Sequence, residues 1–288
     1  MYDTILVPTD GSAGAEAAAR HALDLASAFE STVVVLSVVD DGAVSSGIAD
    51  VDPQIAALER AAREAIETVE RLAEGSDRLI ETAIERGRPH EAIRAFAERE
   101  GVDLISMGTH GRTGLDRLLL GSVAERVVRT SPAPVLTARD GSAERDGYDA
   151  VLLPTDGSEA ASSAIEHGLA VADRYDATVH TLSVIDAEAL AGASSIGMSV
   201  PDVVDDLESD HEAAVEAIAD RSASRGIDAV TRVEQGVPHR AIRDYVDEEG
   251  IDLVAMGTHG RTGLDRYLLG SVTDRVVRAS AAPVLVTR

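Results

Sequence analysis

The chain contains one sequence pattern twice, and this repeat restricts its fold more than any other feature. The segment Tyr2–Ser12 returns at Tyr148–Ser158, 146 residues later, and Met107–Arg117 returns unchanged at Met256–Arg266, 149 residues later. A period this long indicates duplicated domains rather than a solenoid. We therefore predict one domain over residues 1–139, a linker rich in turn-forming residues over 140–147, and a second domain over 148–288.

Each copy alternates short apolar runs with amphipathic segments. In the first copy we expect strands at 4–7, 32–39, 79–84, 104–107 and 134–137, and helices at 13–29, 53–72, 89–100 and 122–129. In the helix from Pro53, the apolar stripe from Ile55 to Leu72 is expected to be core. This alternation predicts an α/β fold of two Rossmann-like domains, each with a parallel sheet covered by helices on both faces. Ligands bind such sheets beyond the carboxyl ends of the strands, where the strand order reverses.

A glycine pattern lies at this position in both copies. After the fourth expected strand the chain has Gly-x-x-Gly, nine further residues, and Gly-Ser at the start of a helix. Glycines allow positive φ and a close approach of amide groups to an anion, and a helix N-terminus is a phosphate site. The serine hydroxyl can cap the helix or donate to a phosphate oxygen. The alternative is that these glycines only form turns and the serines only cap.

These residues resemble the universal stress protein family, whose signature is Gly-x2-Gly-x9-Gly-(Ser/Thr) after the fourth strand. The Pro-Thr-Asp-Gly-Ser segment after the first strand fits the family as well, and the resemblance covers nearly the whole chain, twice. It implies five parallel strands per domain in the order 3-2-1-4-5, and ATP binding in the nucleotide-binding branch of the family.

The resemblance also implies roles for individual residues. In the first domain the adenosine half of the pocket would comprise Pro8, Thr9, Asp10 and Val38. Ribose and the inner phosphates would be held by Met107, Gly108, His110 and Gly111, and the outer phosphates by Gly121, Ser122 and Val123. The equivalent residues of the second domain are Pro154, Thr155, Asp156, Val184, Met256, Gly257, His259, Gly260, Gly270, Ser271 and Val272.

Several of these residues have a simpler interpretation. Asp10 and Asp156 can instead cap a helix or close an Asx turn. His110 and His259 are interpreted as turn or phosphate-proximal residues rather than general bases. The chain has no Lys, so bound phosphates need another counter-charge, and a Mg²⁺ shared between the phosphates and Asp10 or Asp156 would supply it.

Composition excludes several kinds of protein. There is no Cys, all 26 basic residues are Arg, and the net charge is −25. Cysteine-ligated metals, thiol nucleophiles and Walker lysines are therefore excluded.

The acidity of the chain argues against nucleic-acid and anionic-membrane partners. Together with the missing Lys, this acidity resembles that of the cytosolic proteins of halophiles. No signal peptide or bilayer-spanning segment is seen, so we expect a cytoplasmic protein.

Three hypotheses for the function follow. The first is an ATP-binding stress sensor or switch. The second is a slow ATPase or self-phosphorylating enzyme with Ser122 and Ser271 as acceptors, and the third is a dimerisation module without a ligand. In all three, the apolar final strands at 134–137 and 283–286 are expected to pair the domains as an intramolecular pseudo-dimer, because exposed edges are normally covered. A further homodimer is left open.

Overall fold

The computed structural model describes residues 1–40, 42, 51–75, 79–111, 120–142, 147–158, 161–186, 200–258 and 269–288. The chain divides into two compact units, Met1–Gly147 and Tyr148–Arg288. We describe each unit by itself.

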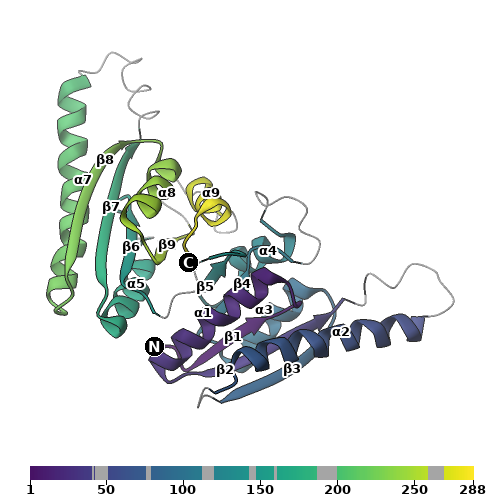
Figure 1. The fold of residues 1–288 in the computed structure, drawn as a ribbon. Coiled ribbons are helices and arrows are strands. Elements are labelled where there is room, and N and C mark those ends of the chain that lie inside the picture. The colour runs from purple at the N-terminus through teal and green to yellow at the C-terminus, as the bar shows by residue number, and fades with distance from the viewer. Residues whose placement is uncertain are drawn as a thin grey trace. The chain divides into compact units, whose positions relative to one another are not determined.

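The first unit is built from alternating strands and helices (Figure 1). In chain order these are β1 (Thr4–Pro8), α1 (Ala13–Phe29), β2 (Thr32–Val39), α2 (Val51–Leu72), β3 (Ile80–Arg86), α3 (Pro89–Glu100), β4 (Leu104–Gly108), α4 (Ser122–Thr130) and β5 (Val135–Ala138). The strands pair in parallel in the order β3-β2-β1-β4-β5, with Ile5 facing Val33 of β2 on one side and Leu104 of β4 on the other. The order therefore reverses between β1 and β4.

The second unit repeats this arrangement. Its elements are β6 (Ala150–Thr155), α5 (Ser162–Tyr175), β7 (Thr178–Asp186), α7 (Val200–Ala223), β8 (Ala229–Gly236), α8 (Pro238–Glu249), β9 (Leu253–Gly257), α9 (Ser271–Ala279) and β10 (Val284–Thr287). Its strands are parallel in the order β8-β7-β6-β9-β10. The predicted fold class is confirmed: each unit is a five-stranded parallel sheet in the order 3-2-1-4-5.

Helices cover both faces of the first sheet. Helices α1 and α2 contact each other, as do α3 and α4, and both pairs pack on strands. The central strands are consequently buried on both sides, which explains their continuous apolar sequence: Ile5, Leu6, Leu104 and Ile105 have no exposed surface. Within the described residues, no helix is long and apolar enough to cross a membrane.

Helix α2 differs from its prediction. It begins at Val51, before the expected Pro53, and its apolar stripe is core only in the second half. Ala62, Ile66 and Val69 are buried, whereas Leu58 is 36% exposed. The first turns of this helix therefore do not pack on the sheet as the 3.6-residue pattern predicted, and the expectation of one continuous core stripe is wrong.

Small residues in α1 bring this helix close to the sheet beside the site. Ser12 caps the helix, because its Oγ accepts a hydrogen bond from the Ala15 amide at 3.3 Å. Ala18, Ala19 and Ala22 are fully buried, and Gly14 lies against the end of β4. This close packing places the N-terminus of α1 at the carboxyl edge of the sheet.

Candidate functional site

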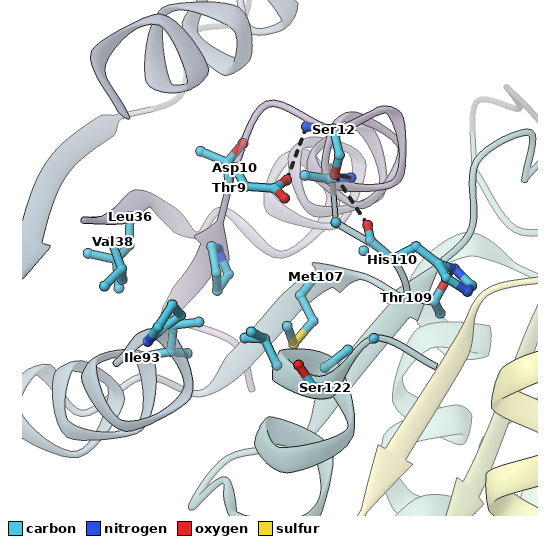
Figure 2. A pocket seen from close by; sticks show the side chains of 18 of the residues that line it. Thr9, Asp10, Ser12, Leu36, Val38, Ile93, Met107, Thr109, His110 and Ser122 are labelled. Atoms are coloured by element: carbon cyan, nitrogen blue, oxygen red, sulfur yellow. Dashed lines mark hydrogen bonds between the residues drawn. The ribbon is translucent and has the colours of Figure 1, made fainter. Parts of the chain in front are cut away.

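A cavity of about 430 Å³ opens at the carboxyl edge of the first sheet, between the ends of β1 and β4 (Figure 2). The structure brings all eleven residues that were predicted for this site into its lining: Pro8, Thr9, Asp10, Val38, Met107, Gly108, His110, Gly111, Gly121, Ser122 and Val123. They come from β1, β2, β4 and α4 and from the loops after the strands. The cavity therefore lies at the reversal of strand order, where parallel sheets bind ligands.

The turn after β1 is held by its own side chains. Asp10 Oδ1 accepts a hydrogen bond from the Ser12 amide at 3.0 Å, and Thr9 Oγ1 accepts one from the Gly11 amide at 3.2 Å. Gly11 has φ of +74°, which explains why the turn needs glycine. The Asx turn that the sequence left open for Asp10 is thus formed.

The glycines of the pattern after β4 are needed for close backbone packing and not for the positive φ that was expected. None of Gly108, Gly111 and Gly121 adopts a positive φ, so that part of the prediction is wrong. A Cβ atom at Gly108 would instead lie 2.6 Å from the Gly14 carbonyl carbon, and one at Gly121 would lie 3.1 Å from the Thr109 carbonyl oxygen. These positions need glycine because two stretches of backbone meet there.

Gly111 has a different neighbour. A Cβ atom at this position would lie 2.7 Å from Asp10 Oδ2, which is the end of an exposed side chain and not backbone. The loop after β4 and the Asx turn after β1 therefore meet at the mouth of the cavity.

The N-terminus of α4 faces the cavity with open amide groups. Gly121 is the N-cap, with φ −60° and ψ 142°, and no side chain caps this helix. The first helical bond runs from the Glu125 amide to the Gly121 carbonyl at 2.9 Å, so the amides of residues 122–124 have no partner within the helix. Ser122 follows the cap and is exposed, so the alternative interpretation, in which its hydroxyl only caps the helix, does not hold. Its hydroxyl is on the cavity lining (Figure 2).

His110 lies in the turn that closes the cavity. Its Nδ1 is 3.0 Å from Thr109 Oγ1, and its carbonyl oxygen accepts a hydrogen bond from Ser12 Oγ at 3.2 Å. Its Nε2 is buried and has no hydrogen-bond partner among the described residues. The backbone of His110 thus ties the two loops together, which fits a turn residue.

The opposite end of the cavity is apolar. Leu36 and Val38 of β2 and Ile93 of α3 form its walls, with Met107 of β4 beneath (Figure 2). Sequence reasoning missed the following lining residues: Ser12, Ala15, Leu36, Asp40, Pro89, Ile93, Thr109 and Ala124. Pro89 was detectable, since it begins a helix directly after an expected strand and thus at the same sheet edge. Ile93 was not, because an apolar helical residue is normally read as core.

The second unit has a cavity of about 380 Å³ at the same edge. Nine predicted residues line it: Pro154, Thr155, Asp156, Val184, Met256, Gly257, Gly270, Ser271 and Val272. His259 and Gly260 lie outside the described residues. The Asx turn recurs, with Asp156 Oδ1 accepting a hydrogen bond from the Ser158 amide at 3.0 Å, and Gly270 again caps a helix without a side-chain cap.

One wall of the second cavity has no counterpart in the first. Leu207 and His211 of α7 form this wall. Elsewhere the second cavity is lined by further residues that the sequence did not single out: Ala161, Leu182, Ile185, Asp186, Pro238, Ile242 and Thr273. Within the described ranges, no group of three or more His, Asp or Glu side chains is arranged to hold a metal ion.

Comparisons with known proteins agree with this fold. The sequence model described as the Universal stress protein family matches residues 1–139 and 147–288. A universal stress protein of Methanocaldococcus jannaschii is 39% identical over 143 residues, covering 48% of this chain and 83% of the relative. One from Mycolicibacterium smegmatis is 28% identical over 300 residues, covering 99% and 96%. The crystal structure of a universal stress protein from Archaeoglobus fulgidus matches with a TM-score of 0.74 at 24% identity, over 99% of this chain and 96% of that one.

Proposed function

Because the chain belongs to the universal stress protein family, twice over its length, we propose that each domain binds ATP at the carboxyl edge of its sheet. Ligand occupancy makes the protein a nucleotide-dependent sensor or switch in a stress response. The single observation that carries this proposal is the joining of an uncapped helix N-terminus and an apolar slot in one cavity, once in each unit.

The chemistry of each end of the cavity suits one part of the nucleotide. The amides at the start of α4 and the positive end of the helix dipole favour phosphate oxygens. Val38 and Ile93 at the other end offer apolar surface to a flat base, and Asp10, which also lines the cavity, offers carboxylate oxygens that ribose hydroxyls can donate to. A volume of about 430 Å³ is in the usual range for a small-molecule site.

Magnesium fits this arrangement as a shared ion. Oδ1 of Asp10 is engaged by the Ser12 amide, and Oδ2 lies at the mouth of the cavity beside Gly111. One carboxylate oxygen with phosphate oxygens and water is the ligand set that Mg²⁺ prefers. Asp10, and Asp156 in the second domain, would then contribute one ligand each.

An enzymatic role is the second candidate, and the exposed Ser122 hydroxyl favours it. Since this hydroxyl does not cap the helix, it is available to attack the terminal phosphorus of ATP. The phosphoryl group would pass to Ser122 Oγ, the hydroxyl proton to solvent, and ADP would leave. Slow release of ADP, with phosphate on Ser122 or Ser271 detected by mass spectrometry, would establish this activity.

We also propose that the two domains pair through β5 and β10 as an intramolecular pseudo-dimer. Each strand is largely apolar and stands last in the strand order of its own unit, and proteins normally cover such an edge. Small-angle scattering that fits two separate bodies on a flexible linker would contradict this pairing.

The proposed function is tested by placing a negative charge on each phosphate subsite. Ser122→Glu and Ser271→Glu each introduce a carboxylate at the first position of a helix, where acidic side chains stabilise the helix. The same carboxylate repels phosphate, and we expect at least a roughly 10-fold loss of ATP affinity at the altered site. Calorimetry should count two sites in the parent, one in each single variant and none in the double variant.

Ser122→Ala and Ser271→Ala are the matched controls. They remove the hydroxyl without adding charge, so both sites should still bind ATP. If the double Glu variant binds ATP as the parent does, or the parent binds no nucleotide, the proposal is wrong.

A further inference from the structure

The two cavities differ at several positions that the repeat places in register, and one of them is a histidine in the second domain. The helices α2 and α7 align with an offset of 149 residues, so Ala62 of the first domain corresponds to His211 of the second, and Leu58 corresponds to Leu207. His211 and Leu207 line the second cavity, whereas Ala62 and Leu58 are not part of the first cavity's lining. An imidazole ring thus borders one site and a methyl group stands in its place in the other domain.

The ring of His211 is held in a fixed orientation. In both domains a serine hydroxyl of the second strand donates to a threonine carbonyl at the carboxyl end of the first strand, Ser37 to Thr9 at 3.0 Å and Ser183 to Thr155 at 2.7 Å. In the second domain this serine also meets His211, whose Nδ1 lies 2.7 Å from Ser183 Oγ.

The number of available protons decides which atom donates in the hydrogen bond between Ser183 and His211. A carbonyl oxygen can only accept, so the single hydroxyl proton of Ser183 lies on the bond to Thr155. The Nδ1 of His211 must then carry a hydrogen and donate to Ser183 Oγ. The side chain is 8% exposed, so packing and this bond together fix the ring.

His211 adjoins the end of the cavity that suits the base. His211 lines the second cavity together with Leu182 and Val184 of β7, which correspond to Leu36 and Val38 at the apolar end of the first cavity. Val184 is the counterpart of Val38, which we assigned to the base. We propose that His211 is a specificity-determining residue of the second site, where its ring contacts the nucleobase, so that this site favours adenine nucleotide over bare polyphosphate more strongly than the first.

This inference rests on the proposed function, so the test measures ATP binding itself as well as the preference for ATP over a ligand without a base. In full-length protein with Ser122→Glu, only the second site remains, and its affinities for ATP and for inorganic tripolyphosphate are measured with Mg²⁺ present. His211→Ala should weaken ATP binding about 5- to 10-fold, the range expected for loss of an aromatic contact with a base. Tripolyphosphate affinity should change less than about twofold, because that ligand has no base.

A matched variant distinguishes the contact of the His211 ring with the base from the hydrogen bond of His211 to Ser183. His211→Asn keeps an N–H donor for Ser183 but removes the rest of the ring, so it should behave as His211→Ala does. Asn also retains the buried hydrogen bond and thereby covers the case in which the Ala variant fails to fold. Parent-like ATP affinity in His211→Asn, or equal losses for both ligands, would overturn the inference.

The first site is an internal reference, because it has no histidine at the position of His211 and can be measured without a substitution in α7. In protein with Ser271→Glu, the ratio of ATP to tripolyphosphate affinity should be about 5- to 10-fold smaller than at the second site. Equal ratios at the two sites would refute the inference while leaving ATP binding intact. If the protein that carries Ser122→Glu and keeps His211 binds no ATP, the proposed function of the second site is refuted instead.

Discussion

Gly108 meets Gly14 backbone to backbone: a Cβ atom at position 108 would lie 2.6 Å from the Gly14 carbonyl carbon and 2.7 Å from the Ala15 nitrogen. Neither of these atoms can move without shifting the start of α1. The first glycine of the Gly-x-x-Gly motif is therefore required by packing of the domain, before any ligand is considered.

Gly108→Ala should consequently destabilise the first domain. We expect the free energy of unfolding to fall by about 1–3 kcal/mol, the usual cost of overpacking, measured from the urea midpoint. Gly236→Ala is the control, since a Cβ atom there has no heavy atom within 4 Å and the backbone is not left-handed. A Gly108→Ala protein as stable as the control would refute this account.

Gly111→Val should act on the ligand and not on the fold. The new Cβ meets Asp10 Oδ2, an exposed side-chain end that can rotate away, while the branched side chain fills the approach to the phosphate subsite. We expect at least a roughly 10-fold loss of ATP affinity at the first site with an unchanged melting temperature.

Gly260→Val tests the same position of the repeat in the second domain. Calorimetric stoichiometries should be two, one, one and zero for the parent, the two single variants and the double variant. Unchanged binding by a folded double variant would show that these glycines only shape turns.

The fold was predictable because it depends on local patterns. Five apolar runs separated by helical segments, repeated in one chain, leave few arrangements other than a parallel sheet with helices on both faces. The position of the site followed from that topology, since residues after β1 and β4 must meet at one edge.

The remaining features depend on long-range packing, which no local pattern records. The need for glycine at 108 arises from Gly14, on another element. Ser122 has the sequence signature of a cap, yet Gly121 takes that position. A helical pattern sorts residues into core and solvent positions, so it did not mark His211 as a cavity residue. Its contact with Ser183, on another element, does.

Stability should rise steeply with salt. The chain carries 51 acidic and 26 basic residues, a net charge of −25, so 25 negative charges lack a positive counterpart even if every Arg is paired. At 0.01 M salt the Debye length is about 30 Å and these charges repel across a domain, whereas at 1 M it is about 3 Å. The melting temperature should increase between 0.01 M and molar KCl. A flat profile would refute the halophilic interpretation.

Acid should destabilise the first domain through His21. Burial, and secondly the charge of Arg20, lower the pKa of His21 from 6.5 to about 4. Its Nε2 lies 3.4 Å from Ser142 Oγ. As the pH falls below about 6.5, the unfolded chain takes up a proton at this residue before the folded one does, so stability is lost down to about pH 4.

This loss should reach at most about 1.4 kcal/mol per pH unit for one histidine. Unfolding in urea between pH 4 and 7, in molar KCl to screen the carboxylates, should show a smaller slope for His21→Gln than for the parent. Arg20→Gln should reduce the slope only in part, because burial is the larger cause of the shift. His167, whose pKa burial also lowers, is the counterpart in the second domain, and His167→Gln should act in the same direction there. Identical slopes for parent and His21→Gln would show that this residue is not the acid-sensitive group.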